Sequence, residues 1–130
     1  MIAVDTSALI AILFLEEEAA RFKAILTAET DIRIAAPTVL EMLMVTTGRK
    51  LPESQRRVRT LLDIFAMRIV PFDEALLAAA HDAFHHFGKG RHRAGLNFGD
   101  CMAYALAKSL GVPLLFKGND LALTDIEAAI

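Results

Sequence analysis

Short apolar segments alternate with longer helical segments along this chain. Residues 2–4 are entirely apolar, as expected of a strand that is covered on both faces, and similar segments recur at 32–36, 69–72 and 113–116. Strands that alternate with helices form parallel sheets with helices packed on both faces. The sequence therefore predicts a fold of the α/β class: a three-layer α/β/α domain with a small central parallel sheet of four to five strands.

Six helices are expected between these strands, and several have recognisable ends. Thr6 or Ser7 is available as the N-cap of the first helix, Asp73 as that of the fifth and Asn97 as that of the sixth. After the last predicted strand, the tail has the pattern of one short helix and a final edge strand. The predicted helices span residues 7–15, 16–28, 37–48, 52–68, 74–88 and 97–111.

Length and composition favour one domain, residues 1–130, that meets another protein. The chain is 55% hydrophobic with a mean hydropathy of +0.42, yet its longest apolar stretch, residues 8–15, is shorter than the ~18–20 residues that span a bilayer. We therefore expect no membrane association, and we expect the surplus apolar surface to contact a partner or a second copy. Cys101 is the single cysteine, which excludes an intrachain disulfide and fits a reducing cytoplasm. We expect no nucleotide cofactor.

Four acidic residues lie at or near the predicted carboxyl ends of strands. Asp5 directly follows the first strand, and Glu41 lies early in the helix after the second strand. Asp100 opens the helix that leads into the fourth strand, and Asp120 follows that strand after a tight turn. In open parallel sheets, functional sites lie beyond the carboxyl ends of the strands. The four acids are therefore candidates for a single site.

Glu41 is a charge inside an otherwise apolar helix, VLEMLMV, and it has no cation at helical spacing. Two carboxylates about 4 Å apart repel by roughly 4 kcal/mol at an effective dielectric constant near 20. A cluster of acids therefore either takes up protons or binds a divalent cation. Oxygen ligands without cysteine or paired histidine favour Mg²⁺ or Mn²⁺, and such a site suits phosphodiester hydrolysis.

Each of three acids also has a simpler explanation when it is considered alone. Asp5 is suited to capping a helix, Asp100 to complementing a helix dipole, and Asp120 to a turn. Glu41 has no such alternative. Their joint position at strand ends favours the metal site over the separate structural roles.

Four stretches of the chain together resemble the PIN-domain ribonucleases, and more narrowly the VapC toxins of bacterial toxin–antitoxin pairs. The stretches are IAVDTSALIAIL, APTVLEMLMV, LNFGDCMAYALAKSLGVPLLFKGNDL and TDI. This resemblance covers the whole chain. It implies a small α/β fold with a parallel sheet, RNA cleavage with Mg²⁺ or Mn²⁺, and inhibition by a cognate VapB antitoxin.

The resemblance also implies roles for particular residues. Asp5, Glu41 and Asp100 match the first three acids of the family's metal site, and Asp120 matches a fourth acid that the family uses less uniformly. The supporting hydroxyls beside the first acid match Thr6 and Ser7, and Ser7 is suited either to orienting Asp5 or to capping the helix.

Basic residues must flank an acidic pocket that holds RNA, because the pocket itself repels phosphates. One cluster lies at 49–59, and another lies in the loop GKGRHRAGL before Asp100. We expect that loop to overhang the site and to bind RNA through Lys89, Arg91 and Arg93.

Partners follow from the same resemblance. The apolar helices at 7–15 and 16–28 are the expected groove for an antitoxin helix, whose arginine would reach the acids, and a homodimer is also expected. An alternative from a different class is a catalytically silent PIN scaffold that binds RNA or a protein partner.

Overall fold

A four-stranded parallel sheet forms the centre of the molecule. The computed structural model describes all residues, Met1–Ile130. The strands are β1 (Ile2–Val4), β2 (Ile32–Ala35), β3 (Arg68–Val70) and β4 (Leu114–Leu115), in the order β3-β2-β1-β4, and each neighbouring pair is parallel. The predicted α/β class and parallel sheet are therefore confirmed.

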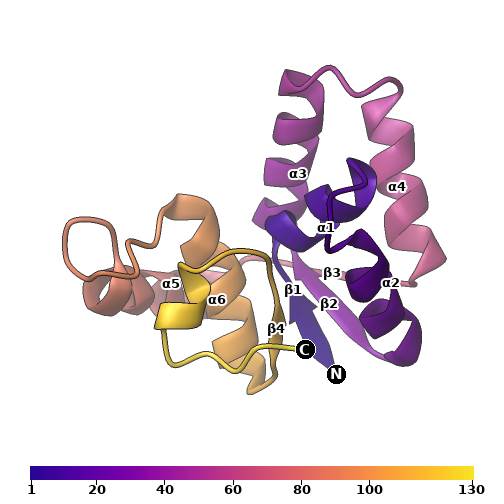
Figure 1. Cartoon of the computed structure of the whole chain (residues 1–130). Coiled ribbons are helices and arrows are strands. Elements are labelled where there is room, and N and C mark those ends of the chain that lie inside the picture. The colour runs from indigo at the N-terminus through magenta and orange to yellow at the C-terminus, as the bar shows by residue number, and fades with distance from the viewer.

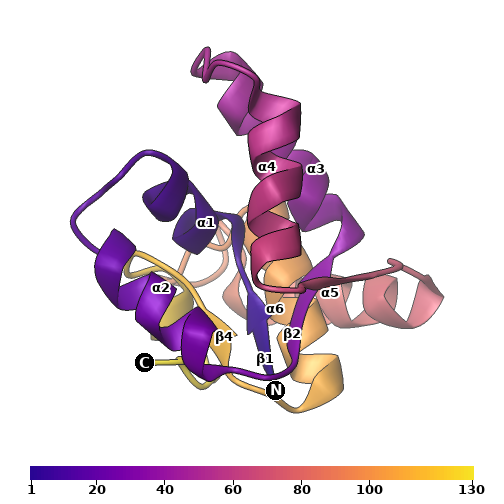
Figure 2. The same cartoon turned by 90° about the vertical axis from the view of Figure 1, so that its right-hand side faces the viewer.

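Helices cover both faces of this sheet (Figure 1). Helices α1 to α4 lie on one side and helices α5 and α6 on the other, so that the molecule has three layers. Figure 2 shows α3 and α4 extending together beyond the sheet. No helix combines the length and the apolar character needed to cross a membrane. The helices are α1 (Thr6–Leu13), α2 (Ala19–Ala28), α3 (Ala36–Gly48), α4 (Ser54–Ile64), α5 (Glu74–Phe87), α6 (Phe98–Leu110) and the short 3-10 helix η1 (Leu121–Leu123).

The side chains of the central strand alternate between two hydrophobic cores. Ile2 and Val4 of β1 belong to the core beneath α1 to α4, whereas Ala3 between them belongs to the core beneath α5 and α6. In β4, Leu115 and Leu114 divide in the same way. This alternation explains why both strands are apolar at every position, because neither face of the sheet meets water.

Two helices are shorter than predicted, and a residue with positive φ lies beside each of them, where the helical path is interrupted. The second helix begins at Ala19 rather than at residue 16, after Leu15 takes a positive φ of 53° that separates it from α1. The fourth helix spans Ser54–Ile64 rather than 52–68, and Ala66, with φ 49°, turns the chain into β3. The acids of residues 16–18 therefore lie in a connection, not in the first turn of a helix.

The predicted tail is present in reduced form. Its short helix is the 3-10 helix η1, and its edge strand is a single parallel bridge between Ala128 and Leu114 of β4. The C-terminal segment thus pairs with β4 at one residue only, where an edge strand was predicted.

The order of the strands places a topological switch point at β1. The chain continues from β1 to β2 on one side and later returns to β4 on the other side. The chain therefore leaves β1 toward α1 on one face of the sheet and leaves β4 toward η1 on the other face, and a crevice is expected at that edge.

Candidate active site

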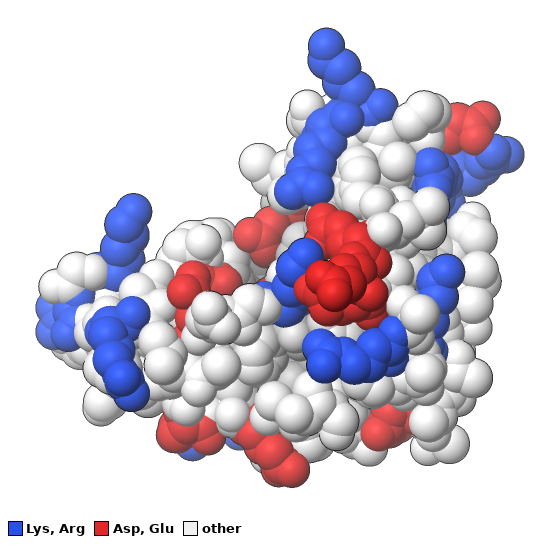
Figure 3. Space-filling view, in the orientation of Figure 1, with Lys and Arg blue, Asp and Glu red and all other residues white.

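An acidic pocket of about 460 Å³ opens at the carboxyl edge of β1 and β4. Figure 3 shows acidic side chains gathered near the centre of this face, with basic side chains around them. The pocket draws on α1, α3, the start of α6 and the segment after β4. Its lining consists of Asp5, Thr6, Ser7, Ile10, Glu16, Glu41, Val45, Arg49, Asp100, Lys117 and Gly118.

Asp5 is fixed at the end of β1 and is 4% exposed. Its backbone N–H continues the sheet by donating to the Leu115 carbonyl at 2.9 Å, and its Oδ2 accepts from the Ser7 backbone at 3.0 Å and from Ser7 Oγ at 2.5 Å. Asp5 is therefore the N-cap of α1, and the expectation that Thr6 or Ser7 would be the cap was wrong. Ser7 instead orients the Asp5 carboxylate.

Burial raises the pKa of Asp5 from 3.8 to about 6. The hydrogen bonds from Ser7 oppose this shift because they stabilise the carboxylate, whereas the negative charges of Asp100 and Glu41 add to it. The electrostatic effects of Asp100 and Glu41 show that the three acids share one environment.

Glu41 enters the pocket from α3 and is held by a residue far away in the sequence. Thr6 Oγ1 donates to Glu41 Oε1 at 2.6 Å and also lies 3.2 Å from the Thr38 carbonyl. Gly99, in the first turn of α6, packs directly against this carboxylate, since a Cβ at that position would lie 2.1 Å from Glu41 Oε2. The position of Glu41 thus depends on both α1 and α6.

Asp100 is held by the capping box that begins α6. Its backbone N–H donates to Asn97 Oδ1 at 2.9 Å, and its Oδ2 accepts from the Asn97 backbone at 3.1 Å. Burial raises the pKa of Asp100, as do the negative charges of Asp120 and Glu41, while the hydrogen bond from Asn97 lowers it. Asp100 therefore both caps the helix and faces the other acids.

The three acids offer a donor set that fits a hard divalent cation. Each of them uses one carboxylate oxygen in the hydrogen bonds described above, and Asp5 Oδ1, Glu41 Oε2 and Asp100 Oδ1 accept none. No group of three His, Cys, Asp or Glu side chains stands close enough together in this structure to hold a metal ion. Metal binding therefore requires these carboxylates to turn toward one another.

Comparison with known proteins identifies the family. Residues 2–127 match the PIN domain family. The chain is 42% identical over 123 residues to ribonuclease VapC30 of Mycobacterium tuberculosis, covering 95% of this chain and 94% of that one. It is 40% identical over 125 residues to ribonuclease VapC of Mycolicibacterium smegmatis, covering 96% and 97%. The chain belongs to the VapC family of PIN-domain ribonucleases.

Two solved structures share the fold. The crystal structure of Mycobacterium tuberculosis VapC20, described as a sarcin-ricin loop cleaving toxin, matches with a TM-score of 0.78 at 13% identity, covering 97% of this chain and 96% of that one. A toxin–antitoxin complex from Klebsiella pneumoniae matches with a TM-score of 0.72 at 17% identity, covering 96% and 93%. At these identities the likeness concerns the fold alone.

The structure brings most of the predicted VapC site residues together. Asp5, Thr6, Ser7, Glu41 and Asp100 all line the acidic pocket. Asp120 does not line it: this residue is exposed and precedes η1, although it is near enough to Asp100 to raise the pKa of that carboxyl.

The predicted RNA-binding residues of the glycine-containing loop lie elsewhere. None of Lys89, Arg91 and Arg93 lines the pocket, and Figure 1 shows the loop between α5 and α6 at the far side of those helices. Arg91 Nε donates to the His85 carbonyl at 3.0 Å, which ties the loop to the end of α5. The loop therefore does not overhang the acids of this VapC chain as expected, and its RNA-binding role stays a prediction.

Sequence reasoning missed two charged residues of the pocket. The sequence pattern places Glu16 in a predicted helix, 16–28, and does not mark Lys117 as a site residue. Lys117 lies two residues beyond the end of β4, and its Nζ pairs with Glu16 Oε1 at 2.7 Å and with Glu18 Oε2 at 3.1 Å. The position of Lys117 after a strand was the available signal.

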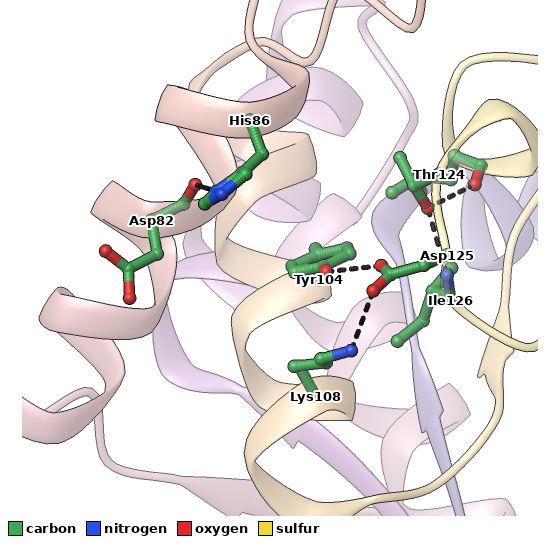
Figure 4. Close-up of polar contacts among 8 residues, drawn as sticks. Asp82, His86, Tyr104, Lys108, Thr124, Asp125 and Ile126 are labelled. Atoms are coloured by element: carbon green, nitrogen blue, oxygen red, sulfur yellow. Dashed lines mark hydrogen bonds and ion pairs between the residues drawn. The ribbon is translucent and has the colours of Figure 1, made fainter.

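Tyr104 lies one turn beyond Asp100 but faces away from the acids. Figure 4 shows Tyr104 and Lys108 of α6 pointing toward Asp125 in the C-terminal segment. Tyr104 Oη donates to Asp125 Oδ1 at 2.5 Å, and Lys108 Nζ donates to Asp125 Oδ2 at 2.8 Å. Lys108 and Tyr104 together lower the pKa of Asp125, while burial and Asp125 raise the pKa of Tyr104. These contacts attach the C-terminal segment to α6.

Proposed function

We propose that this protein is a metal-dependent endoribonuclease and the toxin of a VapBC-type toxin–antitoxin pair. Asp5, Glu41 and Asp100 would hold Mg²⁺ or Mn²⁺, with Asp120 as a fourth acid nearby. One observation carries this proposal: three carboxylates from three separate elements face one pocket, and each has an oxygen that accepts no hydrogen bond.

The bound metal would supply a water of lowered pKa and neutralise charge on the phosphate. The chain supplies the positions of the ligands. Ser7 fixes the orientation of Asp5, Thr6 fixes Glu41, and Asn97 fixes Asp100. Because each carboxylate is anchored through only one oxygen, its other oxygen would be available to a cation once the side chains turned toward one another.

An antitoxin is the proposed protein partner. A groove of about 700 Å³ runs between α1, α2 and α4, with an apolar floor that includes Ile12, Leu61 and Phe65. Lys23, Arg56 and Arg57 line it as well. An amphipathic peptide with apolar and acidic side chains fits this chemistry. An arginine of that peptide, if it reached the acids, would replace the positive charge of the metal.

A homodimer is the proposed assembly. A second apolar cleft, of about 470 Å³, lies between α3 and the start of α6 and includes Leu40, Met44 and Phe98. These side chains are 56%, 66% and 78% exposed, which is unusual for large apolar residues on one surface. Burial of this cleft against a second copy would account for the surplus of apolar residues.

RNA cleavage by purified protein tests the catalytic proposal. We expect cleavage of a labelled single-stranded RNA with Mg²⁺ or Mn²⁺, no cleavage in EDTA, and a loss of about 100-fold or more for Asp5→Asn and for Asp100→Asn. Asp82→Asn, at an exposed acid of α5, is the matched control and should cleave normally. In cells, toxicity and new RNA ends should likewise disappear with Asp100→Asn.

Cleavage or toxicity that survives Asp100→Asn contradicts the proposal. The alternative, a catalytically silent scaffold, predicts that the wild-type protein binds RNA without cutting it under any metal condition.

A further inference from the structure

Two cations line the acidic pocket, and both contact the same carboxylate. Lys117 Nζ lies 2.7 Å from Glu16 Oε1, and Arg49 Nη1 lies 3.7 Å from Glu16 Oε2. No other Lys or Arg is among the residues that line the pocket. Glu16 therefore stands between the two positive charges, with one oxygen toward each.

Both cations are held in place by contacts besides Glu16. Lys117 Nζ also pairs with Glu18 Oε2 at 3.1 Å, and the Lys117 backbone N–H donates to Ser7 Oγ, the hydroxyl that orients Asp5, at 2.9 Å. The Arg49 guanidinium lies 4.9 Å from the centre of the Phe14 ring, within cation–π range. Their side chains are nevertheless 39% and 52% exposed, so that both remain accessible to a ligand.

From this arrangement we propose that Arg49 and Lys117 are the residues that bind the RNA backbone at the pocket, one phosphate each, and that Glu16 neutralises them in the free protein until phosphate displaces it. This inference rests on the proposed ribonuclease function. The pocket carries four carboxylates, Asp5, Glu16, Glu41 and Asp100, which repel a polyanion. A strand whose scissile phosphate reaches the acids must bring its neighbouring phosphates past Arg49 and Lys117.

RNA affinity and its salt dependence test this assignment without any catalytic step. The probe is a fluorescein-labelled single-stranded RNA oligonucleotide in EDTA, with Kd measured by anisotropy at several salt concentrations. For single strands, each lost phosphate contact reduces the slope of log K against log salt by about 0.7, which at 0.1 M salt corresponds to about 5-fold in Kd. Lys117→Met and Arg49→Met should each show this change. In the double variant, Kd should rise about 25-fold and the slope should fall by about 1.4.

A matched control separates phosphate binding from the loss of an ion pair. Lys108 pairs with Asp125 at 2.8 Å, as Lys117 pairs with Glu16, but lies outside the pocket. Lys108→Met should leave the slope unchanged, and Lys117→Arg should retain the wild-type slope. Lys89→Met with Arg91→Met and Arg93→Met tests the loop prediction in the same assay: a reduced slope would support RNA binding by the loop, and an unchanged slope would contradict it.

Glu16→Gln should change RNA affinity in the opposite direction. Because Glu16 competes with phosphate for both cations, its neutralisation should tighten RNA binding about 3- to 10-fold at low salt. If Glu16 were instead required to position the cations, binding would weaken and the proposed role of Glu16 would be overturned.

The outcomes distinguish this inference from the proposed function. A double variant with the wild-type slope overturns the inference while RNA cleavage by the wild type still stands. A reduced slope in a protein that never cleaves RNA overturns the ribonuclease function but leaves Arg49 and Lys117 as the phosphate-binding residues of a silent scaffold.

Discussion

Asp5 is a nearly buried carboxylate, and the charges that raise its pKa are those of two other acids in the pocket, Asp100 and Glu41. Its pKa rises from 3.8 to about 6 on folding, chiefly through burial. Between these values the folded protein keeps a proton that the unfolded chain has lost. The free energy of unfolding therefore falls as pH rises through this range, by about 1.4 kcal/mol per unit and roughly 3 kcal/mol in all. The ionised pocket thus destabilises the metal-free protein at neutral pH.

Asp5→Asn should therefore stabilise the metal-free protein at pH 7.5. We expect a gain in the free energy of unfolding of up to about 3 kcal/mol relative to wild type, and no gain near pH 4, where Asp5 is protonated in the folded protein. Urea unfolding in EDTA at both pH values measures it. Asp82→Asn, at an exposed position, serves as the control. Equal stabilities of wild type and Asp5→Asn at pH 7.5 would contradict this interpretation.

Individual residues show where sequence reasoning succeeded and where it stopped. The absence of a cation near Glu41 correctly marked an unusual charge, and strand ends correctly located Asp5. The actual partner of Glu41, the Thr6 hydroxyl, comes from 35 residues earlier in the chain. Lys117 and Glu16 are separated by 101 residues. Such pairings depend on how strands are ordered in the sheet, which local patterns do not determine.

At the level of elements, the first turn of α6 and the middle of α3 approach each other through Gly99. A Cβ at residue 99 would lie within 2.7 Å of both oxygens of the Glu41 carboxylate. The obstructing atoms are the end of a flexible side chain, so that Glu41 can move aside and the backbone can remain. The cost of a larger residue at Gly99 therefore falls on the site and not on the fold.

Gly99→Ala should separate stability from activity. We expect the variant to fold with a change in unfolding free energy of about 1 kcal/mol or less, and to lose RNA cleavage by about 10-fold or more because Glu41 is displaced. Gly48→Ala, near the end of α3, is the matched control, since a Cβ there meets no atom within 4 Å. Thermal melting and cleavage rates measure both effects. Normal cleavage by Gly99→Ala would show that Glu41 does not need its present position.

Most elements were predictable, but their ends were less so. Apolar runs located every strand, and capping residues such as Asp73 and Asn97 located the starts of α5 and α6. The late start of α2 and the early end of α4 were missed because Leu15 and Ala66 adopt a left-handed conformation that favours glycine, so that the sequence carries no stop signal at either place. The tail forms only one bridge to β4, too little regular structure for a pattern to define.

The whole molecule exposes two apolar surfaces that do not share a residue. The groove between α1, α2 and α4 includes Leu15 and Ile64, which are 77% and 67% exposed, whereas the cleft between α3 and α6 includes Met44 and Phe98. The basic residues Lys23, Arg56 and Arg57 occur only at the groove. This difference in charge is the reason to propose an acidic antitoxin for the groove and a second copy of the chain for the cleft, whose one charged lining residue is Glu41.

Two substitutions test this assignment against each other. Phe98→Glu places a charge in the cleft at the first turn of α6, where a helix accepts an acid, so it should fold yet weaken the homodimer by about 10-fold or more. Ile64→Glu should leave the dimer intact and weaken binding of the cognate antitoxin. Light scattering should give the monomer mass of 14.2 kDa for Phe98→Glu and twice that mass for wild type and Ile64→Glu. The reverse pattern would assign the second copy to the groove and the antitoxin to the cleft. A monomeric wild-type protein would contradict the proposed homodimer.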